Sequence, residues 1–167
     1  MGMNRLSFGL LRRILLTADR RCAVPDCGKA PVRPVAIEPP AEGRDWTDAD
    51  FVALCAGCET RYASGALEPM LVKALREGLD VMQRRFSYPE RDLLRRFAQN
   101  PGTTKVWMPD GIELTVRNLI LDGIIRDTRE RNWLPTAPAS SQSLFELTEK
   151  GQRFVEAWRS GHQLDSF

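Results

Sequence analysis

The chain has 167 residues, of which 43% are hydrophobic, and its formal net charge is +2. This length suits one domain or two small ones, and the lack of an uninterrupted run of about 18 apolar residues excludes a predicted membrane span. The segment from Met1 to Leu16 is interrupted by Arg5, Arg12 and Arg13, so it does not have the apolar centre of an export signal. We therefore expect a cytoplasmic protein with reduced cysteines.

Charge is spread unevenly along the chain. Residues 1–36 hold seven Lys and Arg against two acids, residues 37–60 hold one Arg against six acids, and residues 84–131 hold ten Lys and Arg against seven acids. The basic first and later segments are compatible with contact to nucleic acid. The acidic middle segment suits a protein partner better than DNA.

Short elements separated by turns are predicted in the first half. Residues 8–18 predict a helix that Ser7 caps. The positions expected on its inner face are Phe8, Leu11, Leu15 and Ala18. Residues 32–37 predict an extended segment. Thr47 and Asp50 have the spacing of a capping box before residues 51–54.

Longer helices and a strand pair are predicted in the second half. After a short helix at 59–64, residues 69–86 predict a long helix. Its apolar stripe consists of Leu71, Leu75, Leu79, Met82 and Phe86. The remaining predicted elements are a helix at 89–99, a strand at 105–108, a helix at 112–122, strands at 124–131 and 144–147, and a last helix that begins at Thr148.

The four cysteines form two close pairs. Cys22 and Cys27 are separated by four residues, Cys55 and Cys58 by two, and 27 residues lie between the pairs. Each short loop can direct two thiolates at one ion, and four sulfur ligands complete the tetrahedral coordination of a structural Zn²⁺. The alternatives are two disulfides or four unrelated buried thiols. The expected reducing compartment favours zinc over the disulfides.

The first half also resembles a known family. The segments "RCAVPDCGKAP", "AIEPP" and "DADFVALCAGCETRY", within about residues 11–65, resemble the zinc-bearing branch of the HNH (ββα-metal) nucleases. The resemblance implies a small ββα fold held by zinc. It also identifies three positions that carry His, Asn and His in the family, and this chain has Ala36, Asp50 and Glu59 there. The only histidine in the chain is His162.

Without these side chains, HNH chemistry has no imidazole base and no second Mg²⁺ ligand. We therefore expect a protein that is not an enzyme and has no catalytic residues. An alternative retains nuclease activity by binding Mg²⁺ with the nearby carboxylates of Glu38, Asp50 and Glu59. An exposed carboxylate, which titrates near pH 4, makes a poor general base at neutral pH.

The second half resembles a winged helix-turn-helix module over about residues 87–160. The resemblance rests on "ERDLLRRFAQNPG", "LTVRNLILDGIIRDTRER" and "SLFELTEKGQRFVEAW". It implies that helix 112–122 enters the major groove of DNA and that the following ribbon contacts phosphates. The candidate nucleic-acid contacts are Thr115, Arg117, Asn118, Arg126, Arg129 and Arg131. Trp133 is expected at the tip of the ribbon.

Together these observations predict an α+β fold. We expect a small HNH-like domain with one zinc ion bound by four cysteines at residues 1–66, a connecting helix at 67–86 and a mostly helical winged-helix domain at 87–167. The leading functional hypothesis is a DNA-binding regulator or accessory factor on a decayed nuclease scaffold. The alternatives are a factor or inhibitor that binds a partner protein, and an Mg²⁺-dependent nuclease.

Overall fold

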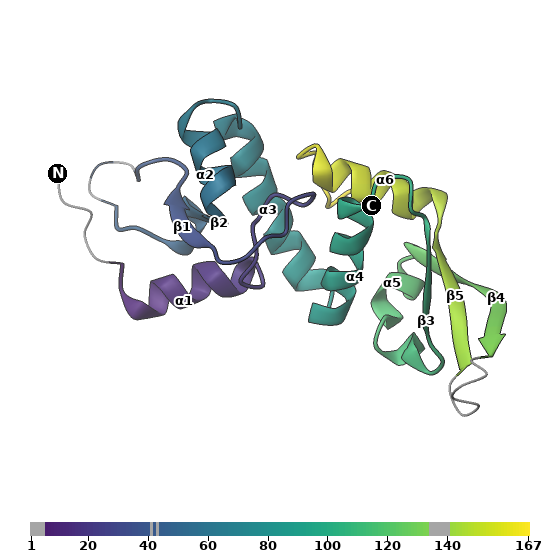
Figure 1. Ribbon diagram of the computed structural model, residues 1–167. Coiled ribbons are helices and arrows are strands. Elements are labelled where there is room, and N and C mark those ends of the chain that lie inside the picture. Colours follow the sequence, from purple (N-terminus) through teal and green to yellow (C-terminus); the bar gives the residue numbers. More distant parts are fainter. Residues whose placement is uncertain (1–5, 41, 43, 134–140) are drawn as a thin grey trace.

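Two small antiparallel sheets lie at opposite ends of the molecule, with helices between them (Figure 1). The structure is a computed structural model that describes residues 6–40, 42, 44–133 and 141–167. The predicted α+β class is confirmed. We call residues 6–66 the front lobe and residues 87–167 the back lobe. No helix in the described part of the chain is both long enough and apolar enough to cross a membrane.

The front lobe consists of two paired strands, with one helix before them and one helix after them in the sequence. It contains α1 (Phe8–Thr17), β1 (Arg33–Ala36), a 3-10 turn (Asp48–Asp50), β2 (Phe51–Leu54) and α2 (Ala56–Ala63). β1 pairs antiparallel with β2, so that Arg33 lies opposite Leu54. All four residues of β2 are buried. The predicted caps form, because Ser7 accepts a hydrogen bond from the backbone N–H of Leu10 and Thr47 with Asp50 makes a capping box.

The predicted inner face of α1 is wrong in part. Leu10 and Ile14 are buried against the sheet, together with Ala18 after the helix, whereas Phe8 is 80% exposed. The helix carries apolar side chains on two faces, and the sequence period alone does not say which face meets the core. The face that contains Phe8 therefore remains at the surface.

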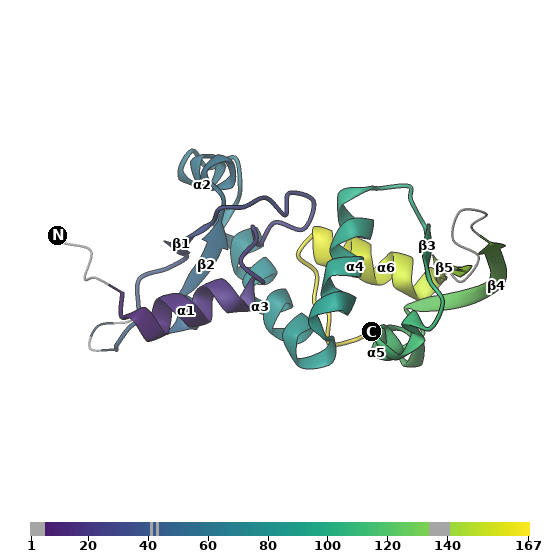
Figure 2. The same ribbon diagram turned by 60° about the horizontal axis from the view of Figure 1, so that its bottom comes forward.

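The long helix α3 (Pro69–Arg85) joins the lobes. It packs against α1 and β2 on one side and against α4 (Tyr88–Gln99) and α6 (Glu149–Arg159) on the other. The predicted stripe is buried from Leu75 to Phe86, while Leu71 is only half-buried. The buried residues of both lobes belong to one connected apolar cluster. Figure 2 shows α3 and α4 in the middle of the molecule from a second direction.

The back lobe places a three-stranded sheet beside α4, α5 and α6. β3 (Lys105–Pro109) and β4 (Ile125–Trp133) both pair antiparallel with the central β5 (Ser141–Leu147). Thr148 caps α6 as predicted, since its hydroxyl accepts a hydrogen bond from the N–H of Gly151.

The predicted helix at 112–122 is divided. Ile112–Leu114 forms a 3-10 turn, and α5 covers only Arg117–Leu121. Val116 between them has φ −113°, which is outside the helical range, and its side chain is buried. A residue with a non-helical backbone and a buried side chain therefore separates the two pieces.

A buried ion cluster ties the lobes together. Asp19 follows α1, and its carboxylate accepts hydrogen bonds from Arg91 Nε at 3.0 Å and Arg95 Nη2 at 3.4 Å. The side chains of Asp19 and Arg95 are 4% and 3% exposed. Asp19 has φ 54°, a left-handed conformation that Asp and Asn tolerate better than most residues. One carboxylate from the front lobe thus compensates two cations on α4.

Replacing Asp19 with Asn is expected to destabilise the protein by about 3 kcal/mol, because it leaves two buried guanidinium groups without a counter-charge. Asn suits the left-handed backbone, so the effect reports the charge. Urea unfolding measures it. The matched control is Asp165→Asn, whose pair with Arg84 is exposed and 3.9 Å long. Equal unfolding midpoints for the two variants would contradict the role of the cluster.

Candidate metal centre and basic surface

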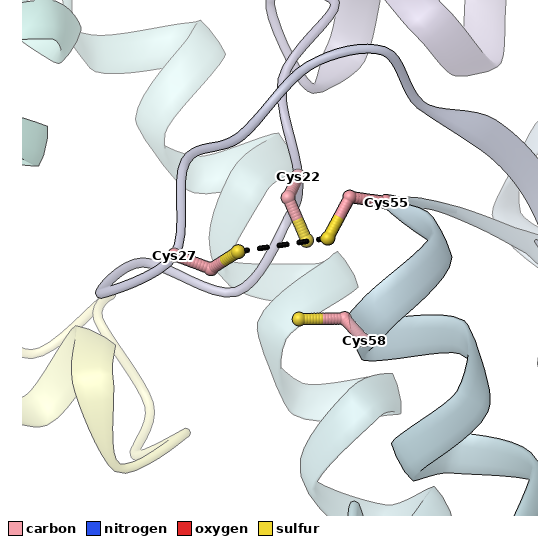
Figure 3. Close-up of side chains that lie close together, drawn as sticks. All are labelled: Cys22, Cys27, Cys55 and Cys58. Atoms are coloured by element: carbon pink, nitrogen blue, oxygen red, sulfur yellow. Dashed lines mark hydrogen bonds between the residues drawn. The ribbon is translucent and has the colours of Figure 1, made fainter.

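The four cysteines converge on one point, although they come from two separate segments of the chain (Figure 3). Cys22 and Cys27 lie in the loop after α1, Cys55 is the N-cap of α2, and Cys58 is in the first turn of that helix. All four sulfur atoms lie within 4.8 Å of one another. The thiols are free, so the alternative of two disulfides is not realised.

The sulfur geometry fits a tetrahedral ion. Cys27 Sγ and Cys55 Sγ are 3.6 Å apart, and four sulfurs at about 2.3 Å from a tetrahedral Zn²⁺ are separated by about 3.8 Å. Cys22, Cys55 and Cys58 are buried, so the site is closed to solvent on most sides. Four thiolates without an open position fit a structural zinc rather than a catalytic one.

Backbone hydrogen bonds hold the first pair of cysteines in place. The N–H groups of Cys27 and Gly28 both donate to the carbonyl of Val24, which closes the turn. The N–H of Ala23 donates to the carbonyl of Ala53, which joins this loop to β2. Because Ala53 is two residues before Cys55, the same contact brings the two cysteine pairs together.

Gly28 is favoured by the backbone conformation of this turn, which packs against the back lobe. Its φ is +55°, in the left-handed region that favours glycine. A Cβ atom here would displace the flexible end of the Gln99 side chain and would lie 3.2 Å from Arg95 Cδ on α4. The loop that carries Cys22 and Cys27 therefore contacts α4, the helix whose arginines bind Asp19.

The thiols differ in their acidity when no metal is bound. Burial raises the pKa of Cys22 to about 11, although the nearby N–H groups of Cys55 and Val24 oppose the shift. Burial also raises the pKa of Cys58, with the charge of Cys22 adding to it. At Cys55 burial acts in the same direction, but the N–H of Cys58 and the neighbouring thiols outweigh it and lower the pKa to about 7.

The positions that correspond to the HNH signature do not form a second metal site. Ala36 ends β1 and is exposed. Asp50 forms a two-pronged pair with Arg44, at 3.0 and 2.6 Å, which lowers the pKa of Asp50 to about 2. Glu59 is paired with Arg33, and Glu38 lies 3.8 Å from Lys73. Each of the three carboxylates has a cation beside it.

The candidate nucleic-acid residues in and just before α5 are exposed, but one of them has an internal partner. Thr115, Arg117 and Asn118 are all at the surface. The side-chain amide of Asn118 donates to Glu90 Oε2 at 3.0 Å, and its backbone N–H donates to Glu90 Oε1 at 2.6 Å. Contact with an adenine would require Asn118 to exchange this hydrogen bond.

Glu90 is an important residue that the sequence analysis missed. It is 1% exposed, and it also accepts hydrogen bonds from the N–H groups of Ser87 at 2.7 Å and Leu119 at 3.2 Å. One carboxylate thus binds the N-termini of both α4 and α5. Ser87 and Glu90 have the spacing of a capping box, so the sequence could have predicted the role of Glu90 at the start of α4. The sequence contains no comparable pattern for its contact with α5.

The ribbon arginines fall into two groups. Arg126 donates to Glu146 at 2.6 Å, and Arg131 forms a two-pronged pair with Asp127 at 3.0 and 2.8 Å. Arg129 has φ 66° at the irregularity between β4 and β5. Its exposed side chain is in no ion pair among the described residues, although its charge helps to lower the pKa of Asp127. Trp133 at the end of β4 is 69% exposed, in agreement with its expected place near the ribbon tip.

Comparison of the chain with protein-family models, curated proteins and solved structures finds no significant match. The sulfur cluster and the placement of the charged side chains therefore carry the functional argument.

Replacing Cys58 with Ser is expected to abolish tight zinc binding and to unfold the front lobe, because serine supplies no thiolate. Limited proteolysis then cleaves between residues 22 and 60, and elemental analysis finds less than one zinc per chain. Ala56→Ser places the same side chain at an exposed position of the same helical turn, and this control keeps both zinc and protection. An equally protected C58S variant would show that the metal does not hold this lobe.

Zinc affinity is expected to fall as the pH falls. Because their pKa values are raised, Cys22 and Cys58 are protonated at neutral pH in the metal-free fold, and binding must release both protons. Thiols of an unfolded front lobe are protonated as well. Release of at least these two protons predicts a loss of at least about 100-fold per pH unit, measured by competition with a coloured chelator. A pH-independent affinity would exclude thiol ligands.

Proposed function

We propose that this protein is a non-catalytic, zinc-stabilised DNA-binding protein, with an HNH-like front lobe and a winged-helix-like back lobe, that acts as a regulator or accessory factor. One observation carries the non-catalytic part. At the three positions of the family signature, Ala36 offers no ligand, and the carboxylates of Asp50 and Glu59 are bound by Arg44 and Arg33. Asp50, with its pKa near 2, is too weak a base to activate water at neutral pH.

The arrangement of the back lobe supports the DNA-binding part. α4, the short α5 and the β4–β5 ribbon follow one another in the order expected of a winged helix, with β3 pairing to the far side of β5. Arg117 at the start of α5 and Arg129 on the ribbon are exposed and are in no ion pair among the described residues. Because Arg126 and Arg131 already pair with acids, Arg117 and Arg129 are the better candidates for phosphate contacts.

The proposal predicts non-specific DNA binding that weakens steeply with salt. Fluorescence anisotropy with a random-sequence duplex across a salt series measures the affinity and its slope. Arg117→Ala and Arg129→Ala should each reduce the slope by about one and weaken binding to all sequences alike. Arg61→Ala, an exposed arginine on α2 of the front lobe, is the control and should change neither value.

Two results would contradict this function. Lack of saturable binding at low salt, or binding that the two back-lobe variants leave unchanged, would remove the DNA interface. Mg²⁺-dependent cleavage of the duplex that Asp50→Ala abolishes would instead support the nuclease alternative. A stable complex with a partner protein that tolerates Arg117→Ala and Arg129→Ala would favour the protein-interaction alternative.

A further inference from the structure

Apolar side chains extend around more than one face of α1, and only the face of Leu10 and Ile14 is fully buried. Leu10 and Ile14 are buried in the front lobe. Phe8 and Leu16 are 80% and 41% exposed, and Leu11 and Leu15 are half-buried. A helix that is apolar on more than one face is normally enclosed. An exposed apolar patch that is rimmed by polar residues is a candidate interaction site.

This second face lines an open groove of about 380 Å³. Its floor combines side chains of α1 with the loop before β1. The apolar lining residues are Phe8, Leu11, Leu15, Leu16, Pro31 and Val32. The charged residues that line it are Arg12 and Arg20, and the described part of the chain contributes no acid to the lining. The neighbouring Arg13 lies 3.6 Å from Asp48, outside the groove.

We propose that this groove binds an acidic amphipathic helix of a partner protein. The partner would insert apolar side chains at helical spacing onto Phe8, Leu11 and Leu15, and its flanking carboxylates would meet Arg12 and Arg20. The N-terminal end of α1, which carries Phe8, is far from the back-lobe sheet in both views (Figures 1 and 2). Partner binding is therefore separate from the proposed DNA contacts of Arg117 and Arg129.

Charge favours this occupant over two others. A second copy of the chain docking through the same face would bring Arg12 and Arg20 of both copies together, without an acid in the groove to offset them. Nucleic acid would match the arginines, but its phosphates would then lie over the apolar floor formed by Phe8 and Leu11. An acidic amphipathic helix can cover the apolar floor with its apolar side chains and pair its carboxylates with Arg12 and Arg20 at the rim.

The test uses the full-length protein and a synthetic helical peptide of about 15 residues, long enough for three to four turns. The peptide has leucines at i, i+3, i+4 and i+7 and glutamates beside them. A second peptide has glutamine in place of each glutamate, and a third has lysine. Fluorescence anisotropy is expected to give micromolar affinity for the acidic peptide, at least tenfold weaker binding of the glutamine peptide and no detectable binding of the lysine peptide.

Three variants test residues of the groove against an exposed apolar position outside it. Phe8→Glu is expected to weaken binding of the acidic peptide at least tenfold. Arg12→Glu is expected to weaken binding of the acidic peptide and to allow the lysine peptide to bind. Met70→Glu alters an exposed apolar residue, 73% exposed, on α3, and should have no effect. Unchanged zinc content shows that each variant is folded.

Several outcomes would overturn the proposal. These are the absence of saturable binding of the acidic peptide up to about 1 mM, equal affinity for the acidic and glutamine peptides, or equal effects of Phe8→Glu and Met70→Glu. Concentration-dependent dimers that Phe8→Glu abolishes would assign the groove to a second copy. Loss of DNA affinity in Phe8→Glu and Arg12→Glu would assign it to nucleic acid. If Arg117→Ala does not change the affinity for DNA, the proposed DNA-binding function fails, but the proposal for this groove still stands.

Discussion

The convergence of four thiol groups is the contact on which the front lobe depends. Between α1 and α2 the chain is rich in proline and turns, and β1 and β2 have only four residues each. A two-stranded pair of this size is marginal in water without further support. Binding of one Zn²⁺ by four thiolates supplies an apparent folding free energy of about 10 kcal/mol or more. This is comparable to the whole stability of a small domain.

The same loop also connects the metal centre to the rest of the molecule. Gly28, next to Cys27, packs against Arg95 and Gln99 of α4, and Asp19 binds Arg91 and Arg95 on that helix. Near the N-terminal end of α4, the buried carboxylate of Glu90 accepts hydrogen bonds from the backbone N–H groups of Asn118 and Leu119 in the first turn of α5. Packing contacts therefore run from the cysteine cluster through α4 to the region proposed to contact DNA. A metal ion bound by the four cysteines would support both lobes without any chemistry at the metal.

Sequence patterns with a single physical solution were predicted well. Cysteine spacing indicated one four-sulfur cluster, and the structure brings the sulfur atoms together. The caps at Ser7 and Thr148 form, and the stripe of α3 that includes Leu75 is buried as predicted. In each case the deciding interaction is local in sequence or requires one residue type, so neighbouring elements have little influence on the outcome.

Features that depend on distant contacts were not predictable in this way. The sequence of α1 offers two apolar faces, and the position of β2 decides that Ile14, and not Phe8, is buried. The break in helix 112–122 lies at the buried Val116, close to the hydrogen bonds that Glu90 makes 28 residues upstream of Asn118. Arg126 pairs with Glu146 because the strand register places the two residues opposite each other. Arg131 pairs with Asp127 of the same strand, across the irregularity that lies between them. Sequence spacing gives neither the register nor the irregularity.

Zinc analysis of the purified protein tests the central claim most directly. Native mass spectrometry combined with X-ray absorption at the zinc edge reports both the number of ions and their ligands. The account predicts one zinc per chain, surrounded by four sulfur atoms at about 2.3 Å. A folded protein without bound zinc, or an ion with nitrogen or oxygen among its ligands, would contradict it.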